Sequence, residues 1–339
     1  MSVFLLHYLS HSSTQTGGYR HENFLANSLE QALKHRNINV KLNKPHRSGY
    51  FKTIFQYLEL LIWGFKNANA NANIVVQRLA LSAVIRNLWT QNKVLLVFHY
   101  FDPKDKKSIF LNYYFKVLLL ALRHLPLKNV GIVVVAPYFE TLLGKLTKHR
   151  LPIFLFPNFF DAVFYQNIRD NPSIIKKKQI YLGQISFKND LIEIEKLVLM
   201  LEKEGYECRF STLFDRGKTD FEQQRTLKVQ YHAYLQYLAQ SSYCLAFTHM
   251  NEGWNRIVHE SILLGTSVIG FEKGGLGNLL TESGSTIVAD AQEAFDYIVA
   301  NEAVKRTPND VFIEKYETKN ASFFLNPILD FIEPKHQKT

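Results

Sequence analysis

One stretch near the carboxyl end, residues 241–290, constrains the fold of this 339-residue chain more than any other. Two short apolar runs flank an amphipathic segment there, with a polar loop after the first run and glycines after the second. This order predicts one βαβ unit whose polar loop lies at the carboxyl end of its first strand. The parts are a strand over Tyr243–Phe247, a loop over Thr248–Trp254, a helix over Arg256–Leu264 that Gly265 ends, a strand over Ser267–Phe271 and a glycine loop over Gly274–Gly277.

The start of the predicted helix has the chemistry of an anion site. Asn255 is a good N-cap residue. The next backbone N–H groups, those of Arg256, Ile257 and Val258, are therefore expected to face whatever binds beyond the strand. Together with the positive end of the helix dipole, these donors favour phosphate or another anion.

Two carboxylates bracket this helix start. Glu252 lies in the loop and Glu260 about one turn into the helix, so both can border one crevice and contact different parts of one ligand. Carboxylates accept hydrogen bonds from sugar hydroxyls in this way in dinucleotide-binding folds. The alternative is a surface helix in which Arg256 and Glu260 form an i,i+4 ion pair worth roughly a few tenths of a kcal/mol.

These two acids belong to a longer pattern. Seven residues separate them, and the pattern continues through EGW at 252–254, Gly265, VIGFEKGG at 268–275 and Gly284. The pattern resembles the donor-site motif of GT-B glycosyltransferases, most closely that of the retaining family-4 group, E-G-F-G-x4-E-A-x3-G-x-P-V-I followed by a glycine pair. The chain departs from that motif at Asn255, where the family usually has glycine, and at Ser261, Ser267 and Asn278.

The resemblance implies a fold and a donor site. The fold would be α/β, with two doubly wound Rossmann-like domains facing across a cleft. Glu260 would contact the ribose of the donor and Glu252 the transferred sugar or its surroundings, with Gly253 in the same loop. Lys188 and the amides at the helix start would hold the diphosphate, whose growing negative charge such groups stabilise without a metal. The residues of that helix start are Asn255, Arg256 and Ile257.

Other positions match or replace residues of the family. Gly17 and Gly18 match a glycine loop under the acceptor and the donor phosphate, and His99 matches a histidine near the transferred sugar. With Glu252, His99 is thus a candidate catalytic residue. Gln184 replaces a phosphate-binding arginine and so removes a bidentate contact. Taken alone, a glycine pair also suits a tight turn, and a lone histidine suits a hydrogen-bonded loop position.

The segment PNFFDAVF at 157–164 resembles the family's linker between domains. The predicted domains are therefore 1–160, for the acceptor, and 161–339, for the nucleotide sugar, with the terminal helix returning to the first domain. Unbroken apolar runs predict buried parallel strands. In the first domain these runs are Ile74–Gln77, Val94–Phe98 and Val130–Ala136. Short strands are also expected over Val3–Leu9 and Asn39–Leu42, amphipathic helices from about Glu22 to Lys34 and over Tyr50–Lys66, and the apolar Ile153–Phe156 precedes the linker.

Basic charge is concentrated in the first half of the chain. Residues 1–157 contain 20 Lys and Arg against 6 Asp and Glu, whereas the remainder contains 20 against 24. A strongly basic half suggests an anionic partner such as a membrane surface, a lipid diphosphate or a nucleic acid; the alternative is a surface charged only for solubility. The membrane-facing candidates are the Tyr50–Lys66 helix with Trp63, and the lysines 104, 106 and 107 before an apolar helix, although both also fit helices packed on a sheet.

Several classes of protein are disfavoured. Cys208 and Cys244 have no second set of ligands nearby, which argues against a disulfide scaffold and a zinc site. The absence of a D-x-D pair disfavours a metal-dependent GT-A enzyme. The chain opens with no secretory signal and has no apolar run of the ~20 residues needed to cross a bilayer. We therefore expect a cytoplasmic protein, able to lie at the inner face of the membrane, with no metal or other cofactor.

Three function hypotheses remain. The first is a retaining glycosyltransferase that uses a UDP- or GDP-sugar and a glycan or lipid-linked acceptor, in the assembly of cell-surface polysaccharide or glycolipid. The second is a nucleotide-sugar-binding protein of the same fold without turnover, acting as a partner subunit, which Gln184 and Asn255 favour. The third, a basic nucleic-acid binder, lacks any recognised motif, so no nucleic-acid partner is expected.

Overall fold

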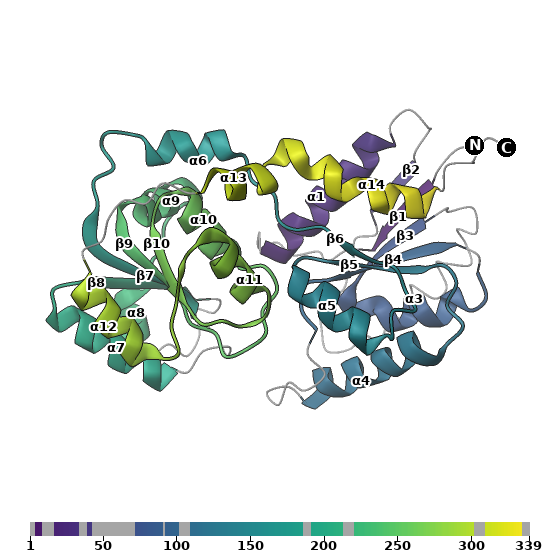
Figure 1. Ribbon diagram of the computed structural model, residues 1–339, viewed down its shortest axis with the longest axis horizontal. Coiled ribbons are helices and arrows are strands. Elements are labelled where there is room, and N and C mark those ends of the chain that lie inside the picture. Colours follow the sequence, from purple (N-terminus) through teal and green to yellow (C-terminus); the bar gives the residue numbers. More distant parts are fainter. Residues whose placement is uncertain are drawn as a thin grey trace. The chain divides into compact units, whose positions relative to one another are not determined.

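The computed structural model describes residues 4–8, 17–33, 39–42, 72–90, 92–101, 109–185, 191–212, 220–301 and 309–333. The chain forms two compact units, one of residues 1–158 with 319–339 and the other of residues 159–318. Each unit is built on one parallel sheet with helices packed on it (Figure 1). The predicted α/β class, with two doubly wound sheets, is confirmed.

The first unit has a six-stranded sheet in the order β2-β1-β3-β4-β5-β6. All of its strand pairs are parallel, and parallel neighbours require crossover connections, so helices cover the faces. Figure 1 shows α1 and α14 on one side of the sheet and α3, α4 and α5 on the other. The strands are β1 (Phe4–Tyr8), β2 (Asn39–Leu42), β3 (Ala72–Val76), β4 (Lys93–Phe98), β5 (Val130–Val134) and β6 (Ile153–Leu155). The helices are α1 (Gly17–Ala32), the short 3-10 helix η2 (Gln77–Leu79), α3 (Ala80–Asn87), α4 (Ile109–His124), α5 (Pro137–Leu146) and α14 (Ala321–Ile332).

The apolar runs explain why these strands lie in the centre of the unit. Every residue of β3 and of β5 is buried, as expected for strands covered on both faces.

One predicted boundary is corrected: α1 begins at Gly17 and not near Glu22, so Gly17 and Gly18 form the first turn of a helix and not a loop. The predicted helix over residues 50–66, with Trp63, and the lysines 104, 106 and 107 lie outside the described residues.

The second unit has a five-stranded parallel sheet in the order β11-β10-β9-β7-β8. In Figure 1, α7 and α12 cover one face and α9 and α10 the other; the side chains of α7 and α12 share one apolar core with the strands. The strands are β7 (Lys177–Ile185), β8 (Glu207–Thr212), β9 (Ser241–Ala246), β10 (Ser267–Gly270) and β11 (Thr286–Ile287). The helices are α6 (Ala162–Arg169), α7 (Leu191–Lys203), α8 (Asp220–Arg225), α9 (Tyr231–Gln240), α10 (Arg256–Leu263), α11 (Gly274–Ser283), α12 (Ala291–Ala300) and α13 (Asp310–Tyr316), before the 3-10 helix η3 (Thr318–Asn320).

The predicted βαβ unit is present as β9, α10 and β10. Gly265 has a φ of 71° and follows the last turn of α10, which is the conformation that favours glycine at a helix end. The glycine loop over Gly274–Gly277 is corrected, because these residues form the first turn of α11.

The end of the chain belongs to the first unit. The ring of Phe331 in α14 lies 5.5 Å, between centroids, from that of Phe154 in β6, and Lys93 in β4 donates a hydrogen bond to the Phe331 carbonyl. Within the described part of the chain, no helix is both long and apolar enough to span a bilayer.

Candidate functional site

A hollow in the second unit lies at the carboxyl ends of β7 and β9. These strands are neighbours in the sheet, and the strand order reverses between them. Ligands of open α/β sheets bind at such a switch point. The hollow is a shallow depression, and its empty volume of about 330 Å³ includes space that is open to solvent. It is lined by Leu182, Gly183, Leu245, Ala246, Phe247, Thr248, Glu252, Asn255, Ile257 and Val258.

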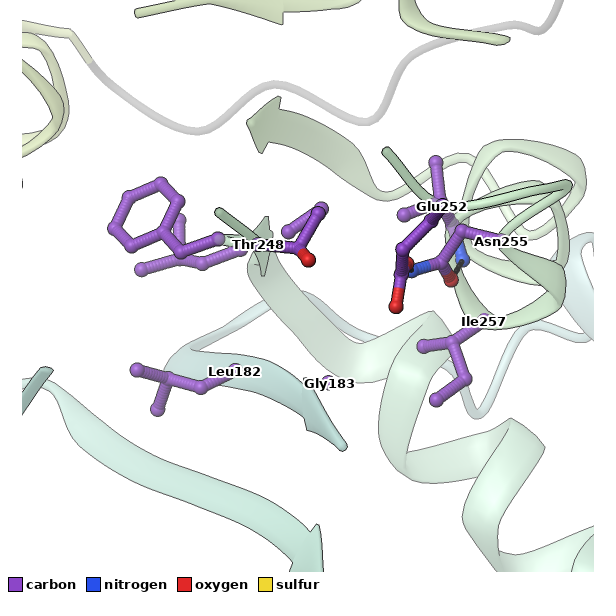
Figure 2. A pocket seen from close by; sticks show the side chains of 10 residues that line it. Leu182, Gly183, Thr248, Glu252, Asn255 and Ile257 are labelled. Carbon is purple, nitrogen blue, oxygen red and sulfur yellow. Dashed lines mark hydrogen bonds between the residues drawn. The ribbon is translucent and has the colours of Figure 1, made fainter. Parts of the chain in front are cut away.

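Glu252 and Asn255 form the polar edge of this hollow. Figure 2 shows their side chains next to each other, with Leu182 and Thr248 across from them. The Asn255 amide Nδ2 donates to Glu252 Oε2 at 3.1 Å. Its Oδ1 accepts from the Val258 N–H at 3.1 Å, so Asn255 is the N-cap that the sequence predicts. This cap corrects one detail, because the Val258 N–H is taken by Asn255 and does not face a ligand.

The loop that carries Glu252 is fixed by Trp254. The Trp254 indole Nε1 donates to Nδ1 of His259 in α10 at 2.9 Å, and its ring packs 4.7 Å from that of Tyr316. His259 is fully buried; burial, and then the charge of Arg256, hold its pKa well below the ordinary value. The ring is therefore neutral, and its Nδ1 accepts the hydrogen bond from the indole N–H.

The backbone of a glycine pair at the start of α11 also contacts the loop that carries Glu252. Gly274, at the start of α11, has a φ of +55°, and a Cβ placed on it would lie 2.6 Å from the Glu252 carbonyl oxygen. The next residue, Gly275, donates its N–H to that oxygen at 2.8 Å. The glycine pair of the motif thus lets α11 approach the backbone of Glu252 closely.

Glu260 and Arg256 are placed differently from the prediction. Neither residue lines the hollow, whose described lining includes Glu252, Asn255 and Ile257. Arg256 Nε lies 2.8 Å from Glu260 Oε1, so the ion pair of the alternative interpretation is present. The pair is buried and not on the surface, since Glu260 is only 2% exposed.

Three tyrosines complete the surroundings of this acid. The hydroxyl groups of Tyr231 and Tyr165 donate to Glu260 Oε1 at 2.7 and 3.4 Å, and that of Tyr234 donates to Oε2 at 3.3 Å. Burial, and then the Glu260 carboxylate, raise the pKa of Tyr165, so its hydroxyl stays protonated and donates. The guanidinium of Arg256 lies over the ring of Phe160, 4.6 Å from its centroid. These contacts tie α6, α9 and α10 together.

The other predicted residues are distributed over both units. Gly253 is half-buried in the loop beside Glu252. Gln184 lies in β7, but its side chain is outside the described part, as is the whole of Lys188. His99 directly follows β4 in the first unit, and Gly17 and Gly18 open α1 of that unit.

Gly183 contributes to the hollow but was not predicted as a site residue. It has a φ of +67° and lies where the pairing of β7 with β8 shifts register. A positive φ of this kind favours glycine, which adopts it without strain. The sequence feature that could have identified Gly183 as a site residue is its position near the end of a predicted strand, just before Gln184.

No protein-family model and no curated protein matches the chain. Solved structures match it over almost its whole length. Sucrose-phosphate synthase from Thermosynechococcus elongatus is 15% identical, with 97% of this chain and 98% of that one covered and a TM-score of 0.69. HepE from Anabaena, in complex with UDP and glucose, is 12% identical, with 97% and 99% covered and a TM-score of 0.69. UDP-GlcNAc 2-epimerase from Methanocaldococcus jannaschii is 12% identical, with 98% and 100% covered and a TM-score of 0.55. At these identities the likeness concerns the fold, and the chain has the two-domain α/β fold of GT-B proteins.

Proposed function

We propose that the chain is a retaining, metal-independent glycosyltransferase that moves a sugar from a nucleotide-diphosphate sugar to a glycan or lipid-linked acceptor. One observation carries the proposal. The hollow at the switch point of the second sheet combines a carboxylate, a carboxamide and the start of α10, namely Glu252, Asn255 and Ile257. A protein of the same fold, HepE, has been solved with UDP-glucose, which supports a UDP-sugar as the first donor to test.

In this proposal the parts of the hollow bind different parts of the donor. The start of α10 attracts the diphosphate through its dipole, and Lys188 adds the positive charge that the family resemblance implies. The Glu252 carboxylate accepts hydrogen bonds from hydroxyls of the transferred sugar. As the bond between sugar and phosphate breaks, the fixed donors stabilise the charge of the leaving diphosphate.

Glu260 has an indirect role in this proposal. A ribose contact of the kind the family implies would have to reach a carboxylate that is only 2% exposed and already bonded to Arg256 and the tyrosines. Its burial and its several partners favour instead a structural role, in which Glu260 holds Arg256 against Phe160 beside the first turn of α10. A buried carboxylate is tolerated only where such partners compensate its charge.

The rival hypothesis is a protein that binds the nucleotide sugar without turnover. Assays of nucleotide release and of sugar transfer, on the wild type and on Glu252→Ala, separate the two. We expect turnover in the wild type and a loss of about 100-fold or more in Glu252→Ala, in the range found when one group that stabilises the transition state is removed. Glu195→Ala is the matched control, since Glu195 is exposed on α7 and outside the lining of the hollow. Binding without release of nucleotide supports the rival, and conversion of UDP-GlcNAc into its epimer would indicate an epimerase.

The acceptor in this proposal is anionic or held at an anionic membrane on the cytoplasmic side, as in the assembly of cell-surface polysaccharide or glycolipid. Support comes from the basic first half of the chain and from α4, which exposes Tyr113, Val117 and Leu120. These residues are spaced to share one helix face. Flotation with vesicles containing phosphatidylglycerol tests the idea: the wild type should float and a Val117→Glu, Leu120→Glu variant should not, and equal flotation of both would exclude this face.

A further inference from the structure

One arginine of the first unit is buried without a partner. Arg86 lies in the last turn of α3 and is only 1% exposed. Two nitrogens of its guanidinium, Nε and Nη2, are buried and form no hydrogen bond with any described residue. Burying a charge is strongly unfavourable unless that charge is paired and hydrogen-bonded. The position of Arg86 therefore calls for a negative partner.

The unpartnered edge of Arg86 is the edge that binds carboxylates elsewhere in the same protein. Arg225 donates from Nε and Nη2 to the two oxygens of Glu202, both at 2.8 Å. Arg169 donates from the same two nitrogens to the oxygens of Asp170, at 2.9 and 3.3 Å. The two nitrogens form a planar fork that matches the paired oxygens of a carboxylate or a phosphate. The chemistry of the Arg86 fork thus suits an oxyanion.

Among the described residues, no acidic side chain serves as the counter-ion of Arg86. Burial lowers the pKa of Arg86, and no carboxylate opposes that effect. For Arg225, in contrast, the hydrogen bond with Glu202 raises the pKa. Acids are also scarce in this part of the chain, since residues 1–157 contain 6 Asp and Glu against 20 Lys and Arg. The negative partner of Arg86 is therefore expected to come from a bound anion.

Other buried polar atoms without partners lie at the same edge of the sheet. The end of α3 is tied to the start of β4, because Asn87 Nδ2 donates to the Asn92 carbonyl at 2.9 Å. Asn73, the second residue of β3, is 2% exposed, and neither polar atom of its carboxamide has a hydrogen-bond partner. The Thr90 hydroxyl, between α3 and β4, is buried without one as well. Such atoms are rare in native proteins and indicate a site that a ligand or water completes.

We propose that the guanidinium fork of Arg86 binds a small oxyanion, inorganic phosphate or a small carboxylate, inside the first unit, with Asn73 and Thr90 as its candidate neutral donors. The anion supplies the counter-charge of Arg86, so it is a structural ligand that stabilises the packing of α3 on the sheet. Because Arg86 is closed to solvent, the anion enters by local opening of this region or during folding. The hollow with Glu252 belongs to the second unit, so this site does not rest on the proposed function.

The first test is urea denaturation of the full chain, dialysed against sodium chloride, as sodium phosphate replaces the chloride at constant ionic strength. The stability of the wild type should rise and saturate, with a folded-to-unfolded ratio that is about 100-fold higher at 100 times the Kd. Arg86→Met keeps a long unbranched side chain without the charge and should lose most of this response. Arg209→Met is the matched control, because Arg209 is paired with Glu207 and partly exposed, and it should respond like the wild type. A parallel titration with sodium acetate tells a carboxylate site from a phosphate site.

In chloride alone the two proteins should compare in the opposite way. Arg86→Met should be at least as stable as the wild type there, because an apolar side chain replaces a buried charge that has no partner. A variant much less stable than the wild type in chloride would show that the chain itself satisfies Arg86, and it would overturn the proposal. An equal response of Arg86→Met and the wild type to phosphate would overturn it too, since the phosphate would then bind elsewhere.

The second test observes Arg86 directly and needs no variant. In ¹H–¹⁵N spectra of the arginine side chains, phosphate or acetate should shift the Nε–H resonance of Arg86 downfield, because this group becomes a donor to an anion. The Nε–H groups of Arg169 and Arg225 already donate to carboxylates, so their resonances are internal controls and should stay in place. An Arg86 resonance that neither anion shifts would refute the site, whether or not nucleotide sugars bind to the second unit.

Discussion

Arg256 Nε and Glu260 Oε1 lie 2.8 Å apart, and the side chain of Glu260 is only 3% exposed. Breaking a buried ion pair from one side leaves an uncompensated charge, which costs about 3–5 kcal/mol. We therefore expect Glu260→Ala to lower the free energy of unfolding by about that amount in urea denaturation. The control is Glu207→Ala, which removes a partner of Arg209 in a pair whose side chains are 34% and 44% exposed and should cost about 1 kcal/mol or less. Equal losses of unfolding free energy in the two variants would show that the buried ion pair stabilises the fold no more than the exposed one.

The close approach of Gly274 to the Glu252 carbonyl predicts a large effect of one methyl group. Gly274→Ala should both destabilise the second unit and weaken binding of the donor, because the loop with Glu252 must move. Gly284→Ala is a matched control: Gly284 also has a positive φ, of +66°, but nothing lies within 4 Å of an added Cβ. Both variants carry backbone strain of about 1 kcal/mol. Only Gly274→Ala should also lose affinity in a donor titration. A similar loss in Gly284→Ala would show that the contact of the added Cβ with the Glu252 carbonyl is not the cause.

The hydrogen bond from Trp254 to His259 predicts that the indole N–H fixes the loop. Trp254→Phe keeps an aromatic ring but leaves His259 Nδ1 buried without a donor, at a cost of about 1–3 kcal/mol. Donor affinity should fall as well, because Glu252 is two residues away in the same loop. Trp89→Phe, at a tryptophan that is 68% exposed, should change the unfolding free energy by less than about 0.5 kcal/mol. Unchanged stability of Trp254→Phe would mean that the bond contributes nothing.

The buried histidines predict that acid destabilises the protein. Burial, then the nearby His99, lower the pKa of His21 to about 3, below the ~6.5 of a histidine in the unfolded chain. As the pH falls below ~6.5 the unfolded chain binds a proton that the folded chain does not. This contribution to stability is therefore complete above ~6.5 and is lost by about 1.4 kcal/mol per pH unit down to about 3.

Urea denaturation at about pH 7 and pH 5 measures this dependence. His21→Gln, whose amide can still donate to the Phe156 carbonyl that His21 Nε2 contacts at 2.6 Å, should show a shallower fall than the wild type. His259, whose pKa is also held low by burial, remains in the variant and accounts for part of the residual slope. A fall of the same steepness in both proteins would show that His21 is protonated in the folded state.

The sequence predicts the architecture because its signals are local. The apolar runs that become β3, β4 and β5 are buried along nearly their whole length, and Asn255 caps α10 as its side chain chemistry suggests. The start of α1 at Gly17 was not predicted, since glycine is a poor helix former and tertiary packing decides the matter.

The surroundings of Glu260 could not be predicted, for a different reason. Its partners Tyr165 and Tyr231 lie 95 and 29 residues away along the chain. The periodicity of apolar residues predicts helices and strands but not contacts between residues so far apart. The spacing of Glu252 and Glu260 places both on or near one helix, but it does not tell which of them faces the hollow. The contact between Glu22 Oε1 and His99 Nε2 in the first unit likewise joins residues that are 77 apart in the chain.

The hollow between the ends of β7 and β9 is proposed to bind a nucleotide-diphosphate sugar. Thermal unfolding of the wild type with increasing UDP- and GDP-sugars tests this binding most directly, with Glu252→Ala and Glu195→Ala measured beside it. A ligand at 100 times its Kd stabilises the folded state by about 2.7 kcal/mol, so the Tm of the wild type and of Glu195→Ala should rise with one of these sugars, and that of Glu252→Ala should rise much less. A wild-type Tm that no UDP- or GDP-sugar raises, or an equal rise in all three proteins, would contradict the claim.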